Sequence, residues 1–136
     1  MTDINATISA AASGMRAQTV RMRIAAENVA NANSTGVDPS QEPFRRRIPL
    51  LESTTLASGA NGVEVRGTSW DMGAFRQEYN PSHPAAGEDG YVRLPNVDTL
   101  VEMMDLREAT RAYEANLNMI EAARTMTTRA LDLLRR

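Results

Sequence analysis

The sequence predicts a mainly α-helical protein with a small β-rich middle, in which two long terminal helices pack as a coiled coil and a module of short strands and irregular segments connects them. Both ends of the 136-residue chain carry apolar residues at helical spacing. All six prolines lie between residues 39 and 95, and aromatic residues make up only 4% of the chain, too few for a large globular core. We therefore divide the chain into an N-terminal helix and turn at 1–36, a middle module at 37–95 and a C-terminal helix at 96–136.

Residues 4–32 are predicted to form the first helix. Apolar or small side chains recur there in alternating steps of four and three residues, with Gln18 as the one polar member, and this 3.5-residue period is typical of a coiled coil. Thr2 or Asp3 is expected to cap the start, and the run from Asn31 to Gly36 to end the helix. The members of the stripe are Ile4, Ile8, Ala11, Met15, Met22, Ala25, Val29 and Ala32.

Residues 37–95 are predicted to form the β-rich or irregular module. Runs that are typical of strands occur at 44–51, 62–66 and 74–79. The Asn61–Gly62 pair before the second run predicts a turn there. Because the module has few apolar residues, we expect it to be unstable on its own.

Residues 97–135 are predicted to form the second helix. Asn96 or Asp98 is expected to cap it, and Glu102 to lie in or near the first turns, where a carboxylate interacts favourably with the helix dipole. Its apolar surface is wider than one partner helix covers, which predicts contact with helices of other chains. One polar stripe is expected to face solvent throughout: Arg107, Arg111, Glu114, Asn118, Glu121, Thr125, Thr128 and Asp132.

Composition argues against several classes of function. The chain has no cysteine, so disulfides and thiol chemistry are excluded. His83 is the single histidine, and with only Glu88 and Asp89 nearby it predicts a rigid turn between two prolines rather than a metal site. We expect no metal or other cofactor and, in the absence of a catalytic constellation, no enzymatic activity.

Charge and hydropathy bear on the expected partners and location. The net charge of −2 gives no case for nucleic acid binding. No window is apolar enough for a membrane span, and the N-terminal residues do not resemble a signal peptide.

The densest charge is the run Arg45, Arg46 and Arg47. In a strand these side chains alternate between two faces, so they do not form one patch. A solvated or partner-facing basic edge is the favoured interpretation, and the absence of interleaved aromatic residues makes nucleic acid a poor candidate.

Two sets of motifs resemble a known family. The segments 12–18 (ASGMRAQ) and 27–36 (ENVANANSTG) resemble the N-terminal signature of bacterial flagellar axial proteins, which are the rod, hook and hook-associated proteins. These usually carry an aromatic residue where Val37 stands, which points away from the hook and distal-rod members. The segments YNPSHPA from Tyr79 and GYVRLPNVD from Gly90, with EMMDL, EA and RAYEAN from Glu102, Glu108 and Arg111, resemble the proximal-rod family of the FlgC type. That family more often has glycine where Ser82 stands.

The resemblance implies a structural subunit of the flagellar basal-body rod, the drive shaft that crosses the periplasm. It also implies export through the flagellar type III apparatus without a cleaved signal peptide. The implied partners are other rod subunits of the same or a different kind, the membrane-embedded ring and the export-gate adaptor. A soluble coiled-coil adaptor or scaffold unrelated to flagella is the alternative function.

For the rod subunit we expect packing between subunits to use residues from both helices, and the helix end and turn to be settled by Asn28, Asn31 and Gly36. The expected packing residues are Ile8, Met15, Met22, Val29, Tyr113, Leu117, Ile120 and Leu131.

Overall fold

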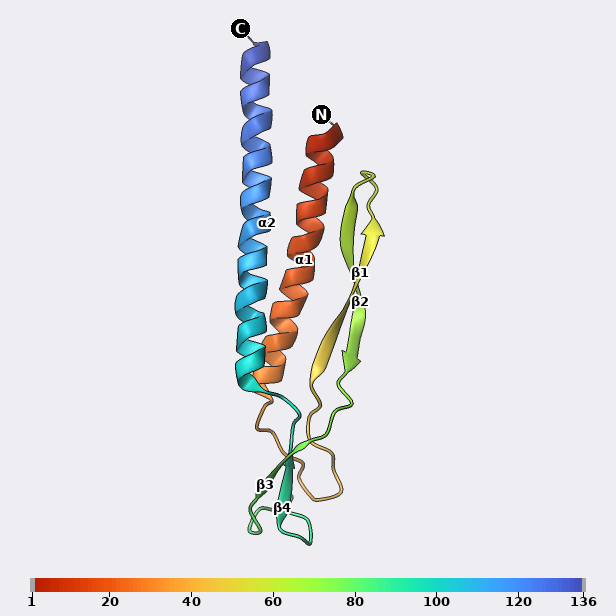
Figure 1. Ribbon diagram of the computed structural model, residues 1–136, viewed down its shortest axis with the longest axis vertical. Coiled ribbons are helices and arrows are strands. Elements are labelled where there is room, and N and C mark those ends of the chain that lie inside the picture. The colour runs from red at the N-terminus through yellow and green to blue at the C-terminus, as the bar shows by residue number, and fades with distance from the viewer. Residues whose placement is uncertain (1, 136) are drawn as a thin grey trace.

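The computed structural model describes residues 2–135 as a long, narrow molecule (Figure 1). The elements, in chain order, are α1 (Thr2–Ala30), β1 (Arg47–Thr55), β2 (Asn61–Trp70), β3 (Arg76–Tyr79), β4 (Tyr91–Leu94) and α2 (Thr99–Leu134). The two helices lie side by side and run in opposite directions, so both termini are at the same end. This confirms the predicted fold, in which two long helices flank a small β-rich middle.

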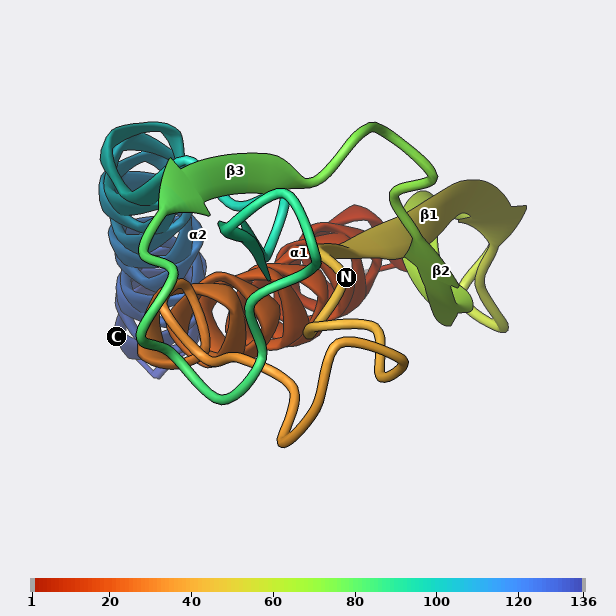
Figure 2. The ribbon, with the colours of Figure 1, turned by 90° about the horizontal axis from the view of Figure 1, so that it is seen from below.

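Helix α1 lies between α2 and the β1–β2 hairpin, as the views in Figures 1 and 2 both show. On the hairpin side its residues are small, and Ser13 and Ala17 are buried. The Ser13 hydroxyl accepts a hydrogen bond of 3.2 Å from the Val63 amide, and the Ser9 and Ser58 hydroxyls are 2.6 Å apart. Small side chains on α1 therefore let the hairpin backbone approach the helix closely.

The start of α1 differs from the prediction. The helix already includes Thr2 and Asp3, so neither residue is its N-cap, and Asp3 instead places a carboxylate in the first turn. There it interacts favourably with the positive end of the helix dipole.

Strands β1 and β2 form an antiparallel pair that runs from Arg47 opposite Trp70 to Thr55 opposite Asn61. The predicted turn at Asn61–Gly62 is wrong, because the chain turns at residues 56–60, where the Leu56 amide donates to the Ala60 carbonyl at 2.8 Å. Gly62 serves a different purpose: a Cβ there would lie 2.8 Å from the Ser13 hydroxyl oxygen. The glycine lets β2 pack directly on α1.

Strands β3 and β4 form a second antiparallel pair below the helices, from Arg76 opposite Leu94 to Tyr79 opposite Tyr91 (Figure 1). The two tyrosine rings meet edge to face with centroids 5.3 Å apart. Arg76 ties this pair to the helices, because its guanidinium donates to the carbonyls of Ala32 at 2.6 Å and Pro95 at 3.0 Å. Arg76 therefore connects this strand pair to the end of α1 and the start of α2.

Helix α2 begins after Asp98, whose carboxylate accepts hydrogen bonds from the amides of Leu100 at 3.0 Å and Val101 at 3.4 Å. The predicted Asp98 cap is confirmed. With 36 residues against the 29 of α1, α2 is about 54 Å long and extends beyond the start of α1 (Figure 1). Every residue at positions 128–134 is exposed, and we call this segment the C-terminal overhang.

Candidate subunit interface

The structure separates the predicted packing residues into two groups. Leu117 and Leu131 are 39% and 47% exposed. Met22 already contacts α2 within the chain, because the Thr110 hydroxyl lies 3.5 Å from its sulfur. Contact of the eight predicted packing residues between subunits stays a prediction. The other six residues are half-buried within the chain: Ile8, Met15, Met22, Val29, Tyr113 and Ile120.

A buried polar cluster joins the lower ends of both helices to β1, and we name it the Asn28 cluster (Asn28, Arg46, Arg47 and Glu102). The Asn28 amide nitrogen donates to the Arg47 carbonyl at 2.9 Å and to a Glu102 carboxylate oxygen at 3.1 Å. Its carbonyl oxygen accepts from the Arg47 amide at 2.9 Å. Asn28 is 0% and Glu102 2% exposed, so a burial that would be costly for either group alone is compensated by hydrogen bonds.

The charge of Glu102 is balanced by Arg46. The guanidinium of Arg46 forms a hydrogen-bonded ion pair with Glu102 and lies 3.7 Å from the carboxylates of both Asp71 and Asp105. Burial alone would lower the pKa of Arg46, but the hydrogen bond and charge of Glu102, with the two aspartates, raise it above its ordinary value. Arg46 therefore stays charged and links the middle module to the first turns of α2.

The neighbouring arginines also have partners within the chain. Arg45 stacks on Phe75 with 4.2 Å between the guanidinium carbon and the ring centroid, and Arg47 pairs with Glu27 at 2.8 Å. The side chains of Arg45, Arg46 and Arg47 are only 21%, 23% and 27% exposed. They do not form a solvated edge, and contact with a partner chain stays a prediction.

The turn after α1 is held by its own polar groups. The Asn31 side chain donates to the Glu27 carbonyl at 2.8 Å, and the Asn31 carbonyl accepts from the Ser34 amide at 3.1 Å. At Gly36 an added Cβ would lie 2.9 Å from the Gln41 carbonyl oxygen, so the loop can close tightly there. The assigned roles of Asn31 and Gly36 stay predictions.

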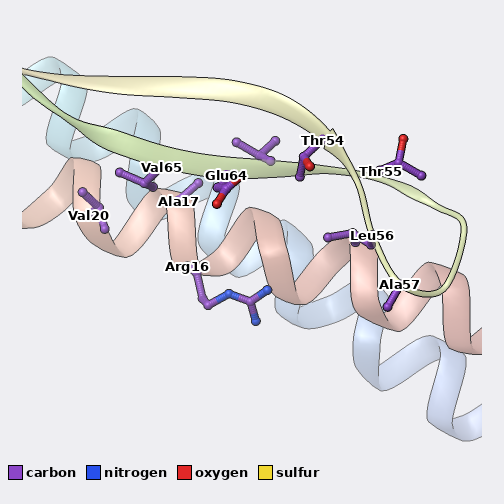
Figure 3. A pocket seen from close by; sticks show the side chains of 10 residues that line it. Arg16, Ala17, Val20, Thr54, Thr55, Leu56, Ala57, Glu64 and Val65 are labelled. Carbon is purple, nitrogen blue, oxygen red and sulfur yellow. The ribbon is translucent and has the colours of Figure 1, made fainter.

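The surface also carries hollows away from the Asn28 cluster. One of about 560 Å³ lies between α1 and the hairpin, where Figure 3 shows Ala17 and Val20 of the helix near Val65, and Leu56 farther along the helix beside Ala57. His83 uses its Nδ1 to accept a hydrogen bond of 3.0 Å from the Ala85 amide. Within residues 2–135, no three metal-binding side chains come together, and neither helix is long and apolar enough to cross a membrane.

The outward side of α2 carries an apolar row that no other element of residues 2–135 covers, and we call it the outer stripe. Its large members are markedly exposed, from 46% at Val101 to 73% at Leu133. At its lower end lies a hollow of about 720 Å³, which Glu108 and Arg111 border. The outer stripe consists of Val101, Met104, Ala115, Met119, Met126 and Leu133.

Similarity to known proteins identifies what this surface belongs to. The chain is 42% identical over 136 residues to the flagellar basal-body rod protein FlgC of Agrobacterium fabrum, an alignment that covers 99% of this chain and 98% of the relative. The chain belongs to the FlgC family of flagellar basal-body rod proteins. FlgC of Bacillus subtilis is 36% identical over 142 residues (93% of this chain and 95% of the relative), and FlgC of Salmonella typhimurium is 32% identical over 124 residues (90% and 92%).

Membership of the FlgC family confirms the predicted structural rod subunit and its location in the flagellar basal body, and it gives no support to an adaptor unrelated to flagella. The family model described as flagellar basal body rod FlgEFG protein C-terminal also matches residues 88–133. That range contains Glu102 and the whole outer stripe.

Proposed function

We propose that this FlgC-family chain is a non-catalytic subunit of the proximal rod that assembles by packing α2 against helices of neighbouring subunits and so transmits torque along the flagellar axis. The observation that supports this proposal is the exposure of apolar side chains along α2, which reaches 63% at Met126 and 81% at Leu134. A large apolar side chain fully removed from water contributes about 1.5–3 kcal/mol. Several such residues on one helix favour burial in an assembly over exposure in a monomer.

The composition of the interior supports the same assignment. Buried apolar residues are mainly alanines, and Ile24, Val92 and Val97 are the largest of them. Such an interior holds two helices close together but gives a single chain little stability of its own. The proposed partners are other rod subunits, the membrane-embedded ring and the export-gate adaptor.

The proposal is tested by a charge placed on the exposed apolar residues of α2. In cells that lack the endogenous protein, Leu117→Asp and Leu131→Asp should prevent incorporation into purified basal bodies and abolish motility, because a carboxylate in a packed seam is costly. Asn118→Asp and Thr128→Asp add the same charge on the solvent stripe and should leave both readouts unchanged.

Circular dichroism of the purified variants separates a failure of assembly from a failure of folding. Leu131 lies in the overhang, so its variant should keep the helix content of the parent chain. Normal motility and normal basal-body content for both leucine variants would overturn the proposal.

A further inference from the structure

Methionine supplies much of the exposed apolar surface of α2. Met104, Met119 and Met126 belong to the outer stripe, where their side chains are 65%, 53% and 63% exposed. The residues four before and three after Met119 are Ala115 and Ala122. Because an alanine side chain ends at Cβ, the methionine side chain projects beyond both neighbours. The thioether groups of the stripe are therefore open to reagents dissolved in water.

The methionines inside the helix pair are in a different environment. Met15 and Met22 are half-buried on α1, and the Thr110 hydroxyl donates a hydrogen bond of 3.5 Å to the Met22 sulfur. Susceptibility to oxidation follows exposure, so a sulfur that is partly enclosed and already accepts a hydrogen bond reacts more slowly. The chain thus carries a reactive and a protected class of methionine.

A peroxide converts methionine to its sulfoxide in one step. The sulfur donates an electron pair to one oxygen of hydrogen peroxide, and the O–O bond breaks. The proton of the transferred oxygen passes to the leaving hydroxide, which becomes water. Sulfur is oxidised by two electrons and the peroxide is reduced. The product is a polar, chiral side chain, and sulfoxide reductases reverse the change.

A sulfoxide oxygen on the outer stripe would find no hydrogen-bond donor among the side chains of the stripe, because all of them are apolar. The main-chain amides of a helix interior already donate to carbonyls one turn earlier. In the free chain water satisfies the oxygen. In an apolar contact the same oxygen would be buried without a partner, which disfavours that contact. Oxidation should therefore act on assembly rather than on folding.

We propose that Met104, Met119 and Met126 form a redox-sensitive site at which oxidation to the sulfoxide keeps the chain out of the rod. The inference rests on the proposed function, because it requires α2 to be packed in the assembly, but it holds for any apolar partner. The site acts between folding and incorporation, while the sulfur atoms are accessible. Met103 is the internal control: it is 55% exposed but lies four residues before Arg107 of the solvent stripe, so a sulfoxide there stays in water.

The first measurement is the order of oxidation in the purified full-length chain. After a short exposure to hydrogen peroxide, ended with catalase, peptide mass spectrometry should find sulfoxide at Met104, Met119 and Met126 well before Met15 and Met22. Circular dichroism of the oxidised chain should show unchanged helix content. Equal rates in the two classes would overturn the proposal, and so would a loss of helix content, because oxidation would then act on folding.

Competition within one cell tests the effect on assembly. A chain with Met104→Leu, Met119→Leu and Met126→Leu is expressed together with the parent chain, and their masses distinguish them in purified basal bodies. Leucine keeps the size of the side chain and has no sulfur to oxidise. After a peroxide pulse during rod assembly, the ratio of variant to parent should rise about tenfold over that in untreated cells. Damage to other proteins affects both chains equally and leaves this ratio unchanged.

The matched control is a Met72→Leu/Met103→Leu chain in the same competition, and its ratio should not respond to peroxide. Met119→Gln places a polar group on the stripe without any oxidant and should be incorporated about tenfold less than the parent chain. Met103→Gln should be incorporated as well as the parent chain.

Two results of the competition contradict the proposal. One is an unchanged ratio for the stripe variant under a pulse that oxidises the stripe methionines of the unassembled parent chain. The other is equal incorporation of Met119→Gln and the parent chain. If either occurs while Leu131→Asp is still excluded from basal bodies, the rod function stands and only the redox sensitivity fails.

Discussion

Asn28 donates a hydrogen bond of 3.1 Å to Glu102, and this contact joins the last turns of α1 to the first turn of α2 where neither side chain reaches solvent. The same amide exchanges two hydrogen bonds of 2.9 Å with the main chain of Arg47, at the start of β1. One side chain therefore connects three elements that are far apart in the sequence, at the point where the middle module leaves the helices.

Replacement of Asn28 should destabilise the whole chain. Asn28→Ala leaves buried donors and acceptors of Arg47 and Glu102 without partners, and we expect a loss of about 3 kcal/mol in the free energy of unfolding. Urea denaturation followed by circular dichroism measures this loss. Asn31→Ala removes one hydrogen bond in a half-buried turn and should cost about 1 kcal/mol. Equal effects of the two substitutions would show that the Asn28 cluster has no special role.

The charge of Glu102 is predicted to matter separately from its shape. Glu102→Gln keeps the size of the side chain but leaves Arg46 with only two aspartates at 3.7 Å, and should cost about 1–3 kcal/mol. Glu121→Gln, on the exposed polar stripe, is the control and should change stability by less than about 0.5 kcal/mol. A Glu102 variant as stable as this control would contradict the ion-pair argument.

The pH dependence of the Arg46 contribution follows from the direction of its shift. The pKa of Arg46 is raised in the folded chain despite burial, mainly by Glu102. A basic group whose pKa is raised by folding stabilises the folded state. This contribution is complete below the unfolded pKa and is lost only as the pH rises through the folded pKa. Both the unfolded and the folded pKa of Arg46 lie far above neutral pH, so the part of the cost of Glu102→Gln that arises from Arg46 should not vary between about pH 6 and 9.

The parts of the fold that were predicted correctly depend on local signals. The period of 3.5 residues along α1, the solvent stripe of α2 and the Asp98 cap are each encoded in one continuous segment of the chain. β4, in contrast, spans only Tyr91–Leu94, which is too short for a recognisable alternation, and it forms because β3 provides a partner. The division into three domains remains a prediction.

The Asn28 cluster was not predicted because its members meet only in the folded chain. Arg46 and Glu102 are 56 residues apart, and nothing near either residue indicates the other. Glu102 was expected in the first turns of α2, where it lies, but its burial depends on α1 and β1. The one available signal was a polar residue, Glu102, on an otherwise apolar helix face. This signal alone does not identify the residue that Glu102 contacts.

The docking of the hairpin on α1 is predicted to depend on Gly62. A Cβ at this position would lie 2.7 Å from Leu56 Cδ1 and 2.8 Å from Ser13 Oγ, so Gly62→Val should push β2 away from the helix. Hydrogen exchange should then increase for the amides of residues 47–70, while the amides of α2 keep their protection. Asn61→Ala, at the exposed neighbouring position, is the control. Unchanged protection in Gly62→Val would show that the hairpin is positioned from its base alone.

The C-terminal overhang is predicted to be the least stable part of α2 in the isolated chain. Its residues have no packing from α1, and a helical segment of this length is marginal in water without tertiary contacts. Limited digestion with trypsin should therefore cleave after Arg129 well before it cleaves after Arg111, although both side chains are exposed. Mass spectrometry of the fragments over time measures the two rates.

Assembly should reverse this order if the overhang is the segment that binds a neighbour. In purified basal bodies the site after Arg129 should be protected at least as well as the site after Arg111, because local opening of a packed helix is needed for cleavage. Leu131→Asp gives the comparison within the monomer: its overhang should be cleaved as fast as in the parent chain, since that residue has no packing to lose before assembly. Slow cleavage after Arg129 in the monomer would mean that the overhang is ordered without a partner, and would remove the reason to expect a subunit contact there.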